Sequence, residues 1–252
     1  MNDKEIKAKM TASWDHGAQE YDTFVSHGIK TKEEKELWIM EFSAVLPTKP
    51  LKVLDVGCGT GAMGLLLSEM GHDVSGVDLS EGMMEVGRKK AAVQNLSMTF
   101  TNGDAEDVPF EDETFDVVVN RHLLWTLPHP DKALASWRRV LKPDGHLLVI
   151  DGVWDNGSTI SRVRRSLSMS IAMRVDKNPH GSHGYQEDVK QYLPNRGGMP
   201  KEKVVDSFMA AGFDVLDIRM LTDIAKCQKM QLPWYQKIAP KDVYYMAVGR
   251  KR

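Results

Sequence analysis

The sequence predicts an α/β protein with a seven-stranded, mostly parallel sheet and helices on both faces. Apolar runs typical of strands alternate with helical stretches about every 25 residues, and this alternation indicates a parallel sheet. The runs are continuously apolar, as expected of strands that helices cover on both faces. The last strand is expected to pair antiparallel at the sheet edge, and a helical N-terminal cap and an inserted lid complete the predicted fold.

The alternation extends over the first 153 residues. Strands are expected at 51–56, 72–78, 97–101, 115–120 and 145–151. Helices are expected at 62–70, 81–94 and 131–141. Gly71 ends the first of these helices, because glycine readily adopts the left-handed conformation that closes a helix. Residues 1–46 look helical, 32–45 especially, and are expected to cap the ligand-binding end of the sheet.

The pattern changes after residue 153. A basic amphipathic stretch and a loop rich in Gly, His, Pro and Asn form a predicted lid over 154–199. A helix at 200–211 and strands at 213–221 and 243–250 follow, with 222–242 expected as a long loop. We expect one domain that consists of a cap (1–46), a core (47–153), the lid (154–199) and a C-terminal helix with two strands (200–252).

Composition and charge argue against several classes of protein. With 42% hydrophobic and 27% charged residues, the 252-residue chain is typical of globular proteins. The net charge of −2 does not indicate a nucleic-acid partner. No apolar run approaches the ~20 residues of a membrane span. Cys58 and Cys227 lie far apart without neighbouring ligand residues, so we expect no disulfide framework, no metal site and a cytoplasmic location. The oligomeric state stays open.

A glycine-rich turn follows the first expected strand. Within ten positions, the stretch LDVGCGTGAMG holds Asp55, Gly57, Gly59, Gly61 and Gly64. Such glycines let the backbone approach a ligand that side chains would block. Asp78 ends the second strand, where a carboxylate can accept hydrogen bonds from a ribose. A dinucleotide and S-adenosylmethionine (SAM) both fit these two features.

Asp55 favours SAM over a dinucleotide. It precedes the first glycine, close to where a dinucleotide would place the two negative charges of its pyrophosphate. SAM instead carries a sulfonium and an α-ammonium group, and a nearby anion stabilises both. The alternatives are that Asp55 caps a helix or braces the turn, and that Asp78 is an exposed turn residue.

Four motifs, in order along the chain, resemble class I SAM-dependent methyltransferases. They are VLDVGCGTG, VSGVDLS, GDAEDVPFEDETFDVVV and RRVLKPDGHLLVID. They look most like the type 11 group, which includes the methyltransferases of ubiquinone and menaquinone biosynthesis, and they imply a Rossmann-like fold. The resemblance covers residues 10–153 well and the terminal strands only in outline. Its motifs are specific for the cofactor and poorly specific for the substrate.

The resemblance also implies which residues contact SAM. Those expected at the methionine and ribose are Asp55, Gly57, Gly59 and Asp78. Those expected at the adenosine are Leu79, Met83, Asp104 and Ala105. Asn120 and Arg121 would border the methyl-transfer channel. Tyr21, in the segment WDHGAQEYD, would close over the cofactor unless this segment is an ordinary amphipathic helix.

Methyl transfer from a sulfonium requires alignment of the acceptor and exclusion of water rather than a fixed catalytic motif. A general base is needed only where the pKa of the acceptor lies above the working pH. His122 is the candidate base and Trp154 a candidate wall of the acceptor pocket, with Arg121 beside them. The alternatives are a hydrogen-bonded structural histidine and a core aromatic residue.

The predicted lid contains two further features. His180, His183 and Tyr185 lie in a loop that either clamps the substrate or simply covers the surface. The helix at 161–175 carries Arg162, Arg164, Arg165 and Arg174. These arginines would recognise an anionic acceptor, attach the helix to a membrane surface, or form a solvated helix face, which is the simplest interpretation.

The sequence therefore predicts a SAM-dependent methyltransferase that acts on a small-molecule acceptor by in-line displacement and releases S-adenosylhomocysteine. Three alternatives stay open. They are methylation of a tRNA or other RNA base, a SAM-binding module without catalysis, and an NAD-dependent oxidoreductase. The overall charge counts against RNA, and Asp55 counts against NAD.

Overall fold

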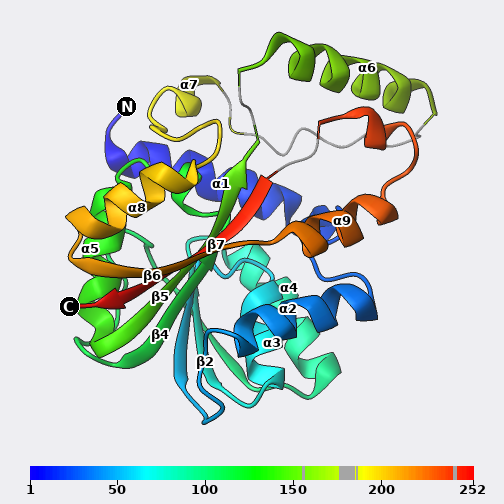
Figure 1. Cartoon of the computed structure of the whole chain (residues 1–252). Helices are drawn as coiled ribbons and strands as arrows, with labels where there is room; N and C mark the ends of the chain where they lie inside the picture. Colours follow the sequence, from blue (N-terminus) through cyan, green and yellow to red (C-terminus); the bar gives the residue numbers. More distant parts are fainter. Residues whose placement is uncertain (155–156, 176–184, 186, 241–242) are drawn as a thin grey trace.

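A computed structural model describes residues 1–154, 157–175, 185, 187–240 and 243–252 (Figure 1). One seven-stranded sheet runs through the molecule, in the order β3-β2-β1-β4-β5-β7-β6. The strands are β1 (Lys52–Val56), β2 (Asp73–Asp78), β3 (Met98–Asn102), β4 (Phe115–Arg121), β5 (Leu141–Val153), β6 (Phe213–Met220) and β7 (Val243–Lys251). The first five pair in parallel, and β7 runs antiparallel between β5 and β6. The predicted fold class is confirmed.

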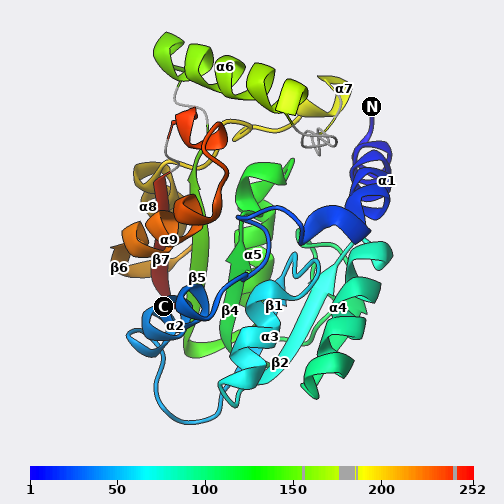
Figure 2. The ribbon, with the colours of Figure 1, turned by 90° about the vertical axis from the view of Figure 1, so that its right-hand side faces the viewer.

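The α-helices of the described residues lie in three places around the sheet (Figures 1 and 2). Those over the two faces are α2 (Lys32–Ser43), α3 (Ala62–Glu69), α4 (Glu81–Gln94), α5 (Pro130–Val140), α8 (Lys201–Ala210) and α9 (Thr222–Gln231). Those at the carboxyl ends of the parallel strands are α1 (Asp3–Tyr21), α6 (Thr159–Val175) and α7 (Glu187–Lys190). Two 3₁₀ turns, η1 (Leu124–Thr126) and η2 (Gln236–Ile238), complete the list.

Each face of the sheet has its own apolar core. On one face, Trp137 of α5 and Phe208 of α8 are fully buried against the strands. On the other face, Phe42 of α2 and Leu67 of α3 are equally buried. Helices that cover both faces explain why the strand sequences are continuously apolar. Only α1 of the predicted N-terminal cap lies over the strand ends, because the Trp38–Phe42 side of α2 packs on the sheet face.

The structure corrects the C-terminal part of the sequence prediction. The stretch 222–242 was expected to be a loop, yet it begins with the helix α9. Ile224, Ala225, Cys227 and Gln228 form the buried side of this helix. Gln228 donates a hydrogen bond of 2.8 Å to the fully buried carboxylate of Glu34 on α2. A polar residue at the centre of the buried side broke the apolar pattern that would have indicated a helix.

Strand order reverses between β1 and β4, since β1 pairs with β2 on one side and with β4 on the other. The crevice at such a point, outside the carboxyl ends of the strands, is where open α/β sheets bind ligands. The glycine turn after β1 and residues 122–125 after β4 therefore meet at the expected position of a site. No helix among the described residues is long and apolar enough to cross a membrane.

The backbone of Gly198 lies in close contact with the end of β5, and a substitution can test this contact. Its φ is 98°, and a Cβ there would lie 2.2 Å from the carbonyl oxygen of Gly152. Gly71 has a similar φ of 93° with nothing within 4 Å, so it is a matched control. We expect Gly71→Ala to lower the free energy of unfolding by about 1 kcal/mol and Gly198→Ala by about 3 kcal/mol. Equal losses in urea titrations would contradict the close contact.

Candidate functional site

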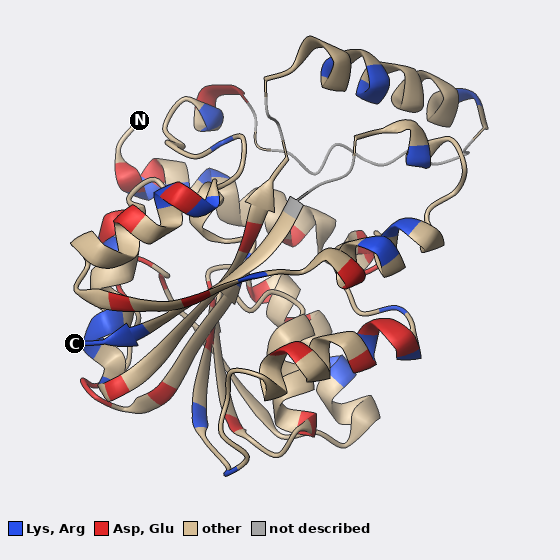
Figure 3. Ribbon diagram, viewed as in Figure 1, with Lys and Arg blue, Asp and Glu red and all other residues tan. Residues whose placement is uncertain are grey.

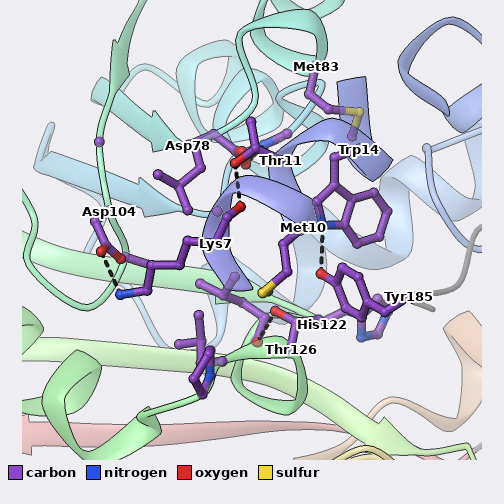
Figure 4. Close-up of a pocket in the computed structure, with 18 of the residues that line it drawn as sticks. Lys7, Met10, Thr11, Trp14, Asp78, Met83, Asp104, His122, Thr126 and Tyr185 are labelled. Carbon is purple, nitrogen blue, oxygen red and sulfur yellow. Dashed lines mark hydrogen bonds and ion pairs between the residues drawn. The ribbon is translucent and has the colours of Figure 1, made fainter. Parts of the chain in front are cut away.

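A pocket lies at the reversal point, enclosed by the glycine turn, the ends of β2 and β4, and α1 (Figure 4). It encloses about 780 Å³ of space, part of it open to solvent. The predicted site residues that line it are Tyr21, Gly57, Gly59, Asp78, Leu79, Met83, Asp104, Ala105, Arg121 and His122. Asp55, Asn120 and Trp154 are not among the described lining residues.

The glycine turn brings bare backbone to the pocket wall. Gly57 and Gly59 have φ values of 65° and 50°, in the left-handed region. A Cβ on Gly57 would lie 2.6 Å from the Leu123 side chain, and one on Gly59 would lie 3.1 Å from Met83 Cε. Both positions therefore require glycine on conformational as well as steric grounds.

The Asp78 carboxylate joins the turns that follow β1 and β2. One oxygen accepts the Gly59 N–H at 2.8 Å, and the other accepts the Ser80 N–H at 2.9 Å. Burial raises the pKa of Asp78 above its usual value, and these backbone hydrogen bonds oppose that effect. The carboxylate lines the pocket and retains lone pairs for a ligand hydroxyl.

Asp55 takes the bracing role that the sequence left as an alternative. Its side chain is buried, and Oδ2 accepts the Gly64 N–H of α3 at 2.8 Å. Burial raises its pKa to about 7. The structure therefore gives no support to a direct contact between Asp55 and a ligand in the pocket.

Asp104 and Lys7 form an ion pair at the far wall of the pocket. Lys7 Nζ lies 2.7 Å from Asp104 Oδ2 and also contacts the carboxylate of Glu106 (Figure 4). Asp104 was predicted from the sequence, but Lys7 was not. The charged residues around Lys7 on α1 form no unusual pattern. The two carboxylates that Lys7 contacts lie 97 and 99 positions away in the sequence. Nothing in the local sequence indicated this pair.

The segment WDHGAQEYD attaches α1 to the core through its two aspartates. Asp15 accepts hydrogen bonds from Ser80 Oγ at 2.6 Å and from the Gly82 N–H at 2.9 Å. Asp22 accepts from Thr60 Oγ1 at 2.8 Å and pairs with Lys90 at 2.7 Å. These partners lie on the glycine turn and on the start and middle of α4, so the segment sets the height of α1 above the pocket.

The aromatic residues of the same segment close the pocket. Tyr21 lines it and stacks on His27, with ring centroids 4.3 Å apart. Trp14, which the sequence analysis did not select, lines it too, and its Nε1–H donates to Tyr185 Oη at 2.7 Å (Figure 4). Tyr185, from the predicted lid, is therefore part of the site.

Arg121 supports the pocket from the end of β4. Its guanidinium donates to the carbonyl oxygens of Ser26 and His27, the latter at 2.8 Å. It also lies over the Trp38 ring, 5.7 Å from the ring centroid. These contacts hold the loop after α1 and indicate a positioning role for this arginine.

His122 borders the pocket in an unusual conformation. Its φ is 57°, and its N–H donates to the Ile150 carbonyl oxygen at 2.8 Å. Burial lowers the pKa of the imidazole well below its usual value, so the ring is neutral at pH 7. Non-glycine residues in this backbone region are uncommon and concentrate at functional sites.

His122 belongs to a cluster of aromatic rings. We define this aromatic cluster as His122, Trp125, Trp154, Tyr185 and Tyr244. The His122 ring meets Trp154 edge-on, with centroids 4.7 Å apart. The ring centroid of Trp125 lies 6.4 Å from those of both Trp154 and Tyr185, and the ring centroid of Tyr244 lies 5.6 Å from that of Trp154. Trp154 thus stands behind His122, one ring away from the pocket lining.

Buried polar atoms without partners gather at the same place. Of twelve such side-chain atoms among the described residues, seven belong to Asn120, Arg121, His122, Trp125, Asp151 and Trp154. Native proteins leave few buried polar groups unpaired, so a local group of them indicates a missing ligand or water. The ends of β4 and β5 thus supply hydrogen-bonding capacity that the described residues do not use.

His180 and His183 lie outside the described residues. Within the part of the chain that the structure describes, no group of three or more His, Cys, Asp or Glu residues has a metal-binding arrangement.

Comparisons with known proteins identify the class of enzyme. Residues 54–149 match a family model described as a methyltransferase domain. The chain is 31% identical over 179 residues to a ubiquinone/menaquinone biosynthesis C-methyltransferase of Idiomarina loihiensis, covering 68% of this chain and 70% of that one. It is 29% identical over 223 residues to a demethylmenaquinone methyltransferase of Clavibacter sepedonicus, covering 85% and 86%.

A solved structure shows the same fold. The phosphoethanolamine N-methyltransferase 2 of Haemonchus contortus, in complex with S-adenosylhomocysteine, matches with a TM-score of 0.64 at 18% identity, covering 94% of this chain and 57% of that one. Fold and sequence thus define a SAM-dependent methyltransferase. The chain belongs to the methyltransferase family, in the type 11 group that the four motifs resembled. Nothing in the comparisons supports the RNA-directed, non-catalytic or oxidoreductase alternatives.

The burial of Asp151 makes the stability of the folded protein depend on pH. Burial raises the pKa of Asp151 to about 8, well above the ordinary range of a carboxyl group. The folded protein therefore keeps a proton that the unfolded chain releases, so stability falls as pH rises from about 4 to about 8. We expect Asp151→Asn to reduce this fall, as measured by urea unfolding at a series of pH values. Profiles with the same slope for both proteins would show that Asp151 is ionised in the fold.

Proposed function

We propose that the enzyme transfers the methyl group of SAM to a small organic acceptor with a planar, oxygenated ring that binds against the aromatic cluster. The observation that carries this proposal is the group of unpartnered N–H and ring nitrogen atoms of His122, Trp125 and Trp154 beside the pocket. Flat rings pack well on aromatic side chains, and a ring oxygen would pair with the nitrogen of His122, which is the one of these three residues that lines the pocket. The relatives named for menaquinone and ubiquinone biosynthesis support an acceptor of this kind.

The residues present fit SAM. The sulfonium of SAM supplies an electrophilic methyl group when it is bound. We assign Asp78 to the ribose hydroxyls, and Leu79 and Met83 to the faces of the adenosine. Asp104 and Ala105 would meet the adenine edge, and for this Asp104 must share its carboxylate with Lys7. The bare backbone of the glycine turn leaves room for the methionine part.

The roof over the pocket would exclude water. Trp14 and Tyr21 of α1 and Tyr185 of the lid lie above the cofactor position, and the Trp14–Tyr185 hydrogen bond joins the two segments. Displacement at a sulfonium destroys a charge, so it is favoured by a dry site in which the acceptor is already aligned. The roof and the aromatic cluster supply these two conditions from opposite sides.

His122 is the group best placed to remove a proton from the acceptor. Burial lowers the pKa of the ring, which keeps it neutral at pH 7 with one nitrogen free to accept a proton, and which also makes it a weaker base than an exposed histidine. It borders the pocket, and its Nδ1 has no partner among the described residues. A ring hydroxyl that loses its proton to His122 becomes more nucleophilic at oxygen and at the adjacent ring carbons. The same residue therefore serves O- or C-methylation.

Cofactor binding is tested by calorimetric titration with S-adenosylhomocysteine. We expect Asp78→Ala to lose ~1–3 kcal/mol of binding free energy, because the ribose hydroxyls lose their acceptor. Asp73→Ala, at the opposite end of the same strand, is the matched control and should bind like the native protein. NAD should give no signal. Native affinity in Asp78→Ala would remove this carboxylate from the cofactor site.

The base is tested with His122→Asn. Asparagine tolerates the left-handed backbone but cannot take up the proton. We expect kcat with a hydroxylated naphthoquinone in reduced form to fall by about 10²–10⁴-fold, with S-adenosylhomocysteine affinity unchanged. His16→Asn, at an exposed position of α1, controls for the substitution itself. An unchanged kcat would exclude His122 as the base while leaving the cofactor assignment intact.

A further inference from the structure

Helix α6 carries its apolar side chains on the outside. Ile160, Val163 and Leu167 are 72%, 62% and 51% exposed, and their spacing of three and four places them along one side of the helix. The residues that are buried instead are Ser161, Ser168 and Ala172. A helix on the surface of a globular protein normally has the opposite arrangement, with its apolar side inward.

Further exposed apolar side chains lie on α6 and in the neighbouring segment. Met169 and Met173 on α6 are 48% and 68% exposed. Met230 and Trp234 are 71% and 66% exposed, in the stretch that leads from α9 into η2. The turn η2 is held to α6 by Arg164, whose Nε donates to the Ile238 carbonyl oxygen at 2.8 Å. We call the exposed side of α6 formed by Ile160, Val163 and Leu167 the apical surface.

The charge of α6 is of one sign. Arg162, Arg164, Arg165 and Arg174 lie within the helix, and residues 159–175 include no Asp or Glu. Figure 3 shows blue without red along this helix, although the whole chain has a net charge of −2. Arginines together with exposed apolar side chains, on a helix without acidic residues, suit contact with the interface of an anionic bilayer.

A second copy of the chain is a poorer partner for this surface. Pairing of two α6 helices would bring their arginines together with no carboxylate on either helix to compensate, and like charges at an interface cost affinity. An anionic lipid surface complements the arginines and the apolar side chains at once. Tryptophan, as at position 234, is also enriched at the membrane–water interface.

The place of α6 in the molecule suits such contact. The helix stands apart from the sheet, at the end where the parallel strands finish and the pocket lies (Figures 1 and 2). Among the described elements, α6 packs mainly against η2. A flat surface can therefore approach α6 before it meets the body of the enzyme.

We infer that α6 is an interfacial helix that docks the enzyme on an anionic lipid bilayer. Ile160, Val163 and Leu167 enter the boundary between headgroups and acyl chains, and the arginines contact the headgroups. This binding needs no acceptor or cofactor, so it stands independently of the proposed function. It also places the pocket end of the molecule towards the bilayer.

The test is flotation of the full-length protein with two kinds of vesicle. One is phosphatidylcholine alone, and the other is an equal mixture with phosphatidylglycerol. We expect binding to the mixed vesicles at low salt and at least tenfold weaker binding to neutral vesicles or at high salt. Equal binding to both kinds, or none to the mixed vesicles, would overturn the inference.

Two double variants locate the contact. Val163→Ser with Leu167→Ser should weaken binding at least tenfold, and Arg162→Gln with Arg174→Gln about 30-fold. Val93→Ser is the matched control, since Val93 is 83% exposed on α4. Thermal unfolding and S-adenosylhomocysteine affinity report whether each variant is folded. Binding that survives both double variants would overturn the inference.

Light scattering tests whether a second copy of the chain, rather than a lipid surface, binds the apical surface. The native protein should have the same mass as the Val163→Ser, Leu167→Ser variant in solution without lipid. A native dimer that this variant converts to a monomer would instead assign the apical surface to self-association, and the lipid proposal would then be wrong.

Discussion

The hydrogen bonds of one buried carboxylate fix the relative position of the loops that form the site. Asp78 accepts the N–H groups of Gly59 and Ser80, and so joins the turn after β1 to the turn after β2. A buried carboxylate without such donors is strongly unfavourable, so the two turns and the anion require each other. Asp15 and Asp22 then attach α1 to Ser80 and Thr60 on these same turns. The height of the roof thus depends on Asp78.

The roof is joined to the core by contacts of two kinds. Towards the core, α1 makes ion pairs and hydrogen bonds, which water can replace at modest cost. Towards the lid, Ile6 and Met10 pack with Tyr185, Val189 and Leu193 in a small apolar cluster. This cluster joins α1 to the described part of the lid, while α1 also packs along α4 of the core.

The sequence was sufficient where local pattern determines structure. Buried parallel strands are continuously apolar, so the fold class was predicted correctly. The glycine turn and Asp78 follow these strands at fixed places, and Gly57, Gly59 and Asp78 do line the pocket. The sequence was insufficient where contacts between residues far apart in the chain determine the structure. α9 is a helix because Gln228 meets Glu34, 194 positions away. Lys7 reaches the pocket because Asp104 and Glu106 hold it, and Trp14 because Tyr185 does.

Strain and unpaired polar atoms coincide at the ends of β4 and β5. His122 has a left-handed backbone there, and seven buried polar atoms of the described residues lack partners between Asn120 and Trp154. Each such group destabilises the folded protein, so this end of the sheet is the least favourable part of its core. The paired carboxylates of the cofactor side show that the same fold can satisfy buried polar groups. The unpaired atoms therefore mark the side of the pocket where we propose that the acceptor binds and completes these hydrogen bonds.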